Sequence, residues 1–244
     1  MMNFIATTSR VPRSDNLFFT INGQSNAVGW ETGAPSEAYL LGVIPRVFIW
    51  TGASFDPLEY GVNNEGELGH GIELKLGYLA SKITTGNIYI VKHARGSSAL
   101  SPWTPSNDWS PSGDLFGQFV TKFNNATNFL TTNSISYEYV SNFWNQGEQD
   151  ANEVSLYHKY GDALNNLEIR MRSELNNVPD SMRFIVCRIT SKTSFPYLQE
   201  VRDFLMNKEY IQADDLTLIG GVVHYDSEGQ NVLADRFFNK SFPY

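Results

Sequence analysis

Short apolar runs alternate along the chain with longer segments in which apolar residues recur at helical spacing. The short runs are rich in β-branched and aromatic residues, which is typical of buried strands. Strands are expected at residues 17–21, 46–50, 87–91, 137–144, 183–189 and 216–223. Helices are expected at residues 71–83, 114–130, 155–175, 197–206 and 227–238. Strands separated by helices predict an α/β fold, in which helices cover both faces of a central parallel sheet.

The first expected strand ends in a turn that carries a candidate nucleophile. Asn22 and Gly23 form a turn signal, and Ser25 follows almost at once. In an open α/β sheet, the carboxyl ends of the strands border the crevice where ligands bind. A serine held on a tight turn there is a candidate for nucleophilic catalysis. The alternative is that Ser25 and Asn26 only cap a helix or satisfy the turn.

Other candidate residues also come directly after expected strands. Gly96 follows the run at 87–91, Gln146 and Glu148 follow the run at 137–144, and His224 follows the run at 216–223. Because the carboxyl ends of parallel strands lie at one edge, we expect these residues to converge, although the strand order stays open. A serine nucleophile needs a base to take its proton, and His224 is the best placed of the four histidines.

Four short blocks of the chain resemble the motifs of one enzyme family. In chain order they are Gly23-Gln24-Ser25-Asn26, Ala94-Arg95-Gly96-Ser97-Ser98 with Trp103 a few residues later, Trp144-Asn145-Gln146-Gly147-Glu148-Gln149-Asp150, and Gly221-Val222-Val223-His224. The chain therefore resembles the SGNH-type carbohydrate esterases related to sialate O-acetylesterases and to carbohydrate esterase family six. Two positions depart from the family pattern: Asn145 stands where His is usual, and Gly221 stands where Asp is usual.

The resemblance implies an SGNH-hydrolase-like three-layer α/β/α sandwich, formed by a single domain over residues 1–244 with an extended segment at residues 1–16. It implies a serine esterase that removes O-acetyl groups from carbohydrates through an acyl-enzyme, without a cofactor or a metal. Ser25 would be the nucleophile and His224 the base and acid. The backbone amides of Ser25 and Gly96 and the side chain of Gln146 would form the oxyanion hole. The residues expected to contact the substrate are Gln24, Asn26, Ser97 and Trp103.

Gly221 leaves His224 without the carboxylate that orients the base in the family. Glu148 could take this role from the neighbouring strand end, or it could bond only the nucleophile loop. Asp226, two residues after His224, could fold back toward the imidazole. A backbone carbonyl or a water molecule could also orient His224 in a Ser-His dyad. We favour Glu148 among these three.

Composition excludes several classes of partner. The net charge of −8 argues against nucleic acid and anionic membranes as partners. No apolar run is long enough to span a membrane, and residues 1–16 lack the features of a signal peptide. Cys187 is the only cysteine and the histidines are scattered, so we expect neither an intrachain disulfide nor a metal site. The compartment, the host and the oligomeric state stay open.

Two other functions are compatible with the sequence. The chain could be a catalytically weakened carbohydrate-binding or virion-associated module, because the acid expected at position 221 is missing. It could also be an esterase or thioesterase that acts on acyl esters other than sugars. The loops at 31–43 and 98–113 are rich in Pro, Ser and Gly, and we expect them to rim the site. Trp103 and Trp109 in the second loop favour a sugar substrate.

Overall fold

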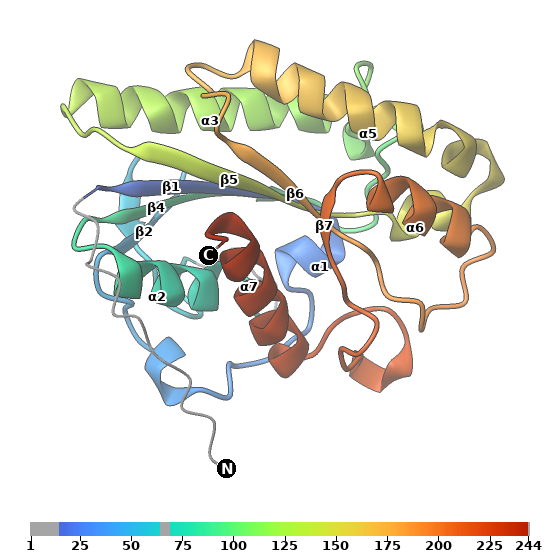
Figure 1. Cartoon of the computed structure of the whole chain (residues 1–244), viewed down its shortest axis with the longest axis horizontal. Helices are drawn as coiled ribbons and strands as arrows, with labels where there is room; N and C mark the ends of the chain where they lie inside the picture. The colour runs from blue at the N-terminus through green and yellow to red at the C-terminus, as the bar shows by residue number, and fades with distance from the viewer. Residues whose placement is uncertain (1–14, 64–68, 244) are drawn as a thin grey trace.

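A seven-stranded, mostly parallel sheet forms the centre of the part of the chain that the computed structural model describes, residues 15–63 and 69–243 (Figure 1). The strands are β1 (Leu17–Gly23), β2 (Val47–Trp50), β3 (Phe55–Pro57), β4 (Ile88–Ala94), β5 (Glu138–Asn145), β6 (Arg183–Cys187) and β7 (Glu209–Ile211). They lie in the order β3-β2-β4-β1-β5-β6-β7, and β3 alone runs antiparallel to its neighbour.

Helices cover both faces of this sheet (Figure 1). The longer helices are α2 (Glu73–Ile83), α3 (Asp114–Thr132), α5 (Val154–Glu174), α6 (Leu198–Met206) and α7 (Ser227–Ser241). Helices α3 and α5 lie above the sheet in this view, and α2 and α7 lie below it. Two short helices, α1 (Ser25–Val28) and α4 (Glu148–Asn152), directly follow β1 and β5. The expected three-layer α/β/α sandwich is confirmed.

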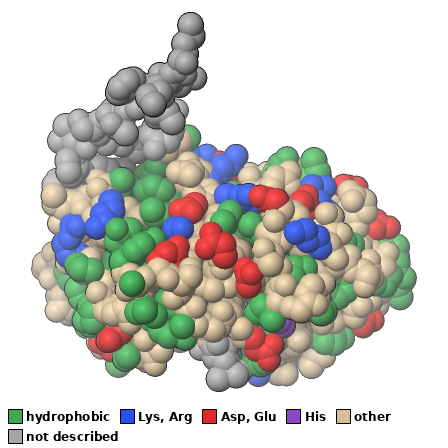
Figure 2. Space-filling model, turned by 90° about the horizontal axis from the view of Figure 1, so that it is seen from below, with side chains coloured by type: hydrophobic (Ala, Val, Ile, Leu, Met, Phe, Trp, Pro, Cys, Tyr) green, Lys and Arg blue, Asp and Glu red, His purple; other side chains and the backbone are tan. Residues whose placement is uncertain are grey.

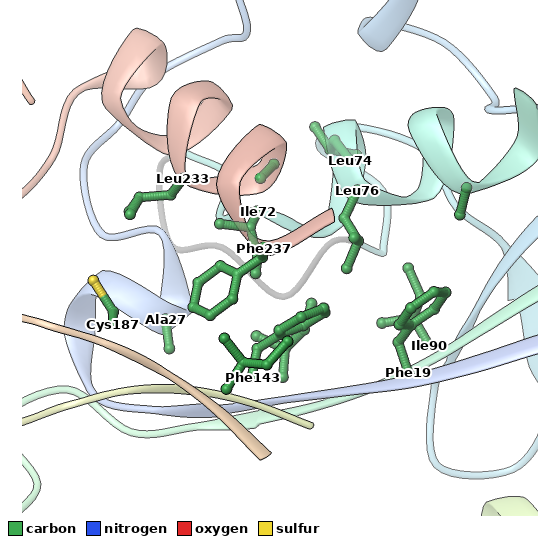
Figure 3. Packing of buried hydrophobic residues seen from close by; sticks show 14 of the residues in the cluster. Phe19, Ala27, Ile72, Leu74, Leu76, Ile90, Phe143, Cys187, Leu233 and Phe237 are labelled. Atoms are coloured by element: carbon green, nitrogen blue, oxygen red, sulfur yellow. The ribbon is translucent and has the colours of Figure 1, made fainter. Parts of the chain in front are cut away.

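Apolar side chains fill the space between the sheet and each helical layer. On the α7 side, Phe143 of β5 packs against Phe237 with ring centroids 4.5 Å apart, and Ala27 of α1 lies beside them (Figure 3). On the α3 side, Trp144 of β5 meets Trp109 with centroids 5.1 Å apart. Since the central strands are buried on both faces, their sequences are continuous apolar runs rather than alternating ones.

The strand order places β1 where the chain changes direction across the sheet. After β1 the chain builds β2, β3 and β4 on one side of it, and then crosses to build β5, β6 and β7 on the other. A ligand site in an open α/β sheet lies at such a switch point, outside the carboxyl ends of the strands. The carboxyl end of β1 leads directly into Ser25.

The strand expected at residues 216–223 is wrong. The last strand of the sheet is β7, and the segment after it forms a loop with one 3₁₀ turn at Ile219–Gly221. Gly220 and Gly221 have φ angles of 59° and 70°, which lie in the left-handed region and interrupt an extended strand. His224 therefore reaches the sheet edge from a loop. The other expected strands and helices are confirmed within a few residues.

The surface that the structure describes mixes charges of both signs. On the face made by α2 and α7, acidic, basic and apolar side chains lie interspersed (Figure 2). Lys75 on α2 pairs there with Glu37 at 3.3 Å and with Asp235 on α7 at 3.0 Å. Among the described residues, no helix combines the length and the apolar character needed to cross a membrane. An extended segment was expected at residues 1–16, and residues 1–14 of it lie outside the described residues. The single-domain organisation stays a prediction.

Candidate active site

Ser25 sits on a turn whose geometry requires glycine before it. Gly23 ends β1 with φ +143°, and a Cβ on this residue would lie 2.0 Å from the carbonyl oxygen of Asn145 on β5. This close approach lets the Gln24 N–H donate to the same carbonyl at 3.0 Å. Only glycine fits such a contact at a positive φ. Ser25, the first residue of α1, is thereby held at the sheet edge with 7% of its surface exposed.

A buried ion pair holds the other end of the same turn. The Lys92 ammonium donates to the Val28 carbonyl at 2.8 Å and to the Glu73 carboxylate at 2.9 Å. The two charged side chains are 1% and 0% exposed. Glu73 also accepts from the Gly71 N–H at 3.0 Å. Because buried charges persist only when they are paired and hydrogen-bonded, this pair fixes the carboxyl end of α1 against β4 and α2.

Ser25 and His224 line two adjoining cavities. The large cavity has a volume of about 600 Å³, and its lining consists of Ser25, Val28, Trp30, Ala94, Arg95, Gly96, Ser97 and His224. The small cavity has a volume of about 240 Å³, and its lining consists of Gln24, Ser25, Ser97, Glu148, Gln149, Asn152, Phe195, Val223 and His224. Six residues expected from the sequence are thus brought together: Ser25, His224, Gly96, Gln24, Ser97 and Glu148.

The loop that carries His224 is clamped by the side chain of Asn26. The Asn26 amide donates to the Val223 carbonyl at 3.1 Å, and its oxygen accepts from the Tyr225 N–H at 3.1 Å. The carbonyl of His224 itself accepts from the Ile219 N–H at 2.7 Å. Asn26 is 1% exposed and lines neither cavity. Asn26, which the sequence analysis expected to contact the substrate, thus holds the backbone on both sides of His224.

Burial sets the protonation of His224. Desolvation lowers the pKa of this half-buried imidazole below its usual 6.5, and the charge of Glu31 partly opposes this effect. The ring of Trp30 lies beside it, with centroids 6.4 Å apart. No residue in the described ranges hydrogen-bonds the imidazole. His224 is therefore neutral near pH 7 and able to accept a proton.

Neither of the two carboxylates considered as a partner of His224, Glu148 and Asp226, hydrogen-bonds the imidazole. Glu148 accepts from the Asn26 amide at 2.7 Å, and its second oxygen has no partner among the described residues. Burial raises the pKa of the Glu148 carboxyl. Asp226 caps α7 by accepting from the Gly229 N–H at 2.8 Å. A Cβ on Gly221 would have no neighbour within 4 Å, so this position faces open space. Glu148 is linked to the backbone on both sides of His224 through the side chain of Asn26.

Gln146 lies beneath the site and not in its wall. This wholly buried side chain donates one amide proton to Asp150 at 2.6 Å and the other to the Ser98 carbonyl at 3.0 Å. Asp150 in turn accepts from the N–H groups of Leu100 and Ser101, at 2.8 and 3.0 Å. In this arrangement the Gln146 amide has no proton left for an oxyanion, and it supports the loop that carries Gly96.

The remaining aromatic and histidine candidates lie outside the cavities. Trp103 is 44% exposed and lines neither cavity, and Trp109 is buried against Trp144. His70 is buried and contacts the Ser227 hydroxyl at 3.0 Å. Burial lowers the pKa of His93 to about 4, and its ring contacts the carbonyl of Leu115. Within the described ranges, no three or more His, Cys, Asp or Glu side chains are grouped to hold a metal ion.

Four residues that line the large cavity were not predicted from the sequence as site residues: Val28, Trp30, Ala94 and Arg95. Trp30 and Arg95 both face the space next to Ser25. Arg95 belongs to one of the four motifs, but it occupies the position at which the motif is variable. Trp30 follows the nucleophile turn directly, and only the fold shows that its ring reaches His224.

Comparison with known proteins identifies a family and a fold. The sequence profile described as carbohydrate esterase, sialic acid-specific acetylesterase, matches residues 15–242. A protein from Arabidopsis thaliana has a similar structure, with TM-score 0.75 and 18% identity over 93% of this chain and 98% of its own. The structure of NanS is also similar, with TM-score 0.69 and 18% identity over 95% of this chain and 98% of its own. A carbohydrate acetylesterase from Xanthomonas citri has TM-score 0.62 and 14% identity over 93% of this chain and 55% of its own. No curated protein matches in sequence.

Proposed function

The chain belongs to the carbohydrate esterase family of sialic acid-specific acetylesterases, and from this membership we propose that it hydrolyses O-acetyl esters of carbohydrates through an acetyl-enzyme on Ser25. As a member of this family it is a carboxylic ester hydrolase. The observation that carries the finer proposal is that Ser25 and His224, which come from opposite ends of the chain, line the same two cavities.

His224 transfers the protons of the reaction. The neutral imidazole takes the proton of the Ser25 hydroxyl while the serine oxygen attacks the acetyl carbonyl. The tetrahedral intermediate collapses when the protonated imidazole gives this proton to the sugar oxygen, which leaves as an alcohol. Water then attacks the acetyl-serine ester with His224 again as base. This second step releases acetate and restores Ser25.

Backbone amides at two loops stabilise the oxyanion. The N–H groups of Ser25 and Gly96 donate to no backbone carbonyl in the described part of the chain, so both are available to a ligand. Both residues line the large cavity. Such donors act in a partly desolvated site, where a hydrogen bond to a developing negative charge is stronger than in water. Gln146 contributes indirectly, because its bond to the Ser98 carbonyl holds the loop of Gly96 in place.

His224 is oriented by its loop. The clamp made by Asn26 fixes the backbone at Val223 and Tyr225, and Glu148 anchors the Asn26 amide from behind. The site then works as a Ser-His dyad with Glu148 as a positioning residue. The clamp does not depend on a carboxylate at position 221, because this position faces open space.

Acetate release from matched esters tests this function. We expect wild type to release acetate from an O-acetylated methyl glycoside, and Ser25→Ala to release none. Ser173→Ala, which changes an exposed serine on α5, serves as the control and should match wild type. Faster turnover of an acetyl thioester or a long-chain acyl ester than of the sugar ester would favour the non-sugar alternative. Glycan binding without any acetate release would favour the binding module.

A further inference from the structure

A cavity outside the active site lies between α5, in the upper helical layer of Figure 1, and the loop at residues 98–113. We call it the α5 cavity. Its volume is about 390 Å³, and it shares no lining residue with the two cavities at Ser25. This volume is at the lower end of the range for small-ligand sites. The α5 cavity therefore has room for a small ligand, and the proposed reaction does not use it.

The floor of the α5 cavity is apolar. Leu100 and Trp109 of the loop are each 1% exposed, and Leu167 of α5 is 2% exposed. Pro102 and Pro111, which are exposed, continue this apolar surface to the rim. A ligand with C–H groups on one face would remove this surface from water, which favours binding.

Three polar side chains of α5 border the cavity without a partner. Lys159, Asp162 and Asn166 are three and four residues apart, so they lie on one side of the helix. No side chain among the three hydrogen-bonds or ion-pairs with a residue that the structure describes. The rim therefore offers an ammonium that donates, a carboxylate that accepts and an amide that does both.

Buried hydrogen bonds hold the loop side of the cavity in place. The Asp108 carboxylate accepts from the N–H of Ser110 at 3.1 Å and from its hydroxyl at 2.6 Å. The Trp109 N–H donates to the Ala99 carbonyl at 3.0 Å, and its indole N–H donates to the Ser98 hydroxyl at 3.2 Å. Because this wall is ordered before a ligand arrives, binding costs less conformational entropy.

The charges at the rim favour a ligand without net charge. Lys159 and Asp162 carry opposite charges, and the charge of Arg170, which also lines the cavity, is balanced by Glu174 at 2.7 Å. An anion would meet the Asp162 carboxylate, and a cation would meet the Lys159 ammonium. Hydroxyl groups both donate and accept, so a neutral sugar can bond all three free side chains while its C–H groups pack on the floor.

We propose that the α5 cavity binds one unit of a neutral glycan chain, as a second sugar-binding site of this protein. One stretch of chain borders both sites, since Ser97 lines the two cavities at Ser25 and Leu100 lines the α5 cavity. Three residues of chain span at most about 11 Å, so one oligosaccharide can occupy both sites. Binding at the α5 cavity is independent of the proposed function, and only its benefit to catalysis rests on that function.

Binding is tested by NMR titration of wild type with neutral tetrasaccharides of xylose, glucose and mannose. At least one of them should shift the indole N–H signal of Trp109. Asn166→Ala should weaken binding of that sugar roughly two- to tenfold, because one hydrogen bond is lost. Ala163→Trp fills the cavity and should abolish binding. Asn165→Ala, at the neighbouring exposed position of α5 outside the cavity, is the matched control and should bind as wild type does.

Kinetics tests whether the two sites bind one chain. The substrates are the O-acetylated form of the tetrasaccharide that binds and p-nitrophenyl acetate, which is too small to reach the α5 cavity from Ser25. Ala163→Trp should raise KM for the tetrasaccharide ester and leave its kcat unchanged, because the remote contact is equally strong before and during the reaction. Both constants for p-nitrophenyl acetate should stay at their wild-type values, which also shows that the variant is folded.

Four outcomes would overturn separate parts of this inference. Absence of a shift with all three sugars, or equal binding by Asn166→Ala and Asn165→Ala, would refute the second site even if Ala163→Trp did not fold. Tighter binding of a glucuronate or glucosamine oligomer than of the neutral sugars would refute the assignment to a neutral glycan. An unchanged KM in Ala163→Trp would refute the link between the two sites. Binding at the α5 cavity without acetate release from any ester would refute the proposed function and leave the second site standing.

Discussion

Replacement of Asn26 by alanine is expected to disable His224 while the sheet stays folded. The amide of Asn26 makes three hydrogen bonds: it donates to Glu148 at 2.7 Å and to the Val223 carbonyl at 3.1 Å, and it accepts from the Tyr225 N–H at 3.1 Å. Two of these bonds bracket His224 on either side. The substitution therefore releases the loop that carries the base.

The magnitude follows from the groups left without partners. Each buried group that loses a hydrogen bond costs about 1–3 kcal/mol, and the half-buried carbonyl of Val223 can recover water. We therefore expect the free energy of unfolding to fall by about 3 kcal/mol, mainly from Glu148 and Tyr225. A displacement of the base by about 1 Å can lower kcat roughly 10²-fold, so kcat should fall that far with little change in KM.

Steady-state kinetics with p-nitrophenyl acetate and urea denaturation measure the two effects separately. Asn142→Ala is the matched control. Asn142 is equally buried on β5 and accepts from Thr20 at 2.7 Å and from Asn22 at 2.6 Å, but it lines neither cavity. It should lose stability and keep kcat. Full kcat in folded Asn26→Ala, or an equal loss of kcat in Asn142→Ala, would refute the clamp.

Three further predictions concern protonation and packing. Because burial lowers the pKa of His224, the midpoint of the fall of kcat/KM at low pH should lie below 6.5, whereas a midpoint above 6.5 would indicate a carboxylate in direct contact. Lys92→Met should lower the free energy of unfolding in urea by about 3–5 kcal/mol, because it leaves the Glu73 carboxylate buried and unpaired, and adding Glu73→Gln should recover much of this loss. Gly23→Ala should give little folded protein by circular dichroism, since its Cβ would overlap the Asn145 carbonyl; a Tm equal to that of wild type would contradict this reasoning.

Local sequence was sufficient to predict the strands and helices that form the core of the fold. The apolar run of β1 and the helical spacing of α3 depend only on neighbouring residues, and both were predicted within two residues of their ends. The position of Ser25 at the end of β1 followed from the same pattern. Because the carboxyl ends of parallel strands meet at one edge, the convergence of Gly96 and Ser25 could also be predicted.

The errors arose where distant contacts decide the structure. Residues 216–223 contain an apolar run that resembles a strand, but two consecutive left-handed glycines turn it into a loop. Strand β7 has three residues, too few to produce a pattern. Gln146 bonds Asp150 and the Ser98 carbonyl, and two of the three partners of Asn26 lie near the other end of the chain, so motif position could not reveal that both side chains are engaged below the surface.

Covalent labelling tests the central claim most directly. A fluorophosphonate that reacts with activated serines should add one label per chain, and peptide mass spectrometry should place it on Ser25. His224→Ala should slow this labelling strongly, because the serine then lacks its base. A label on another serine, or an equal labelling rate in His224→Ala, would contradict the assignment of Ser25 and His224 as nucleophile and base.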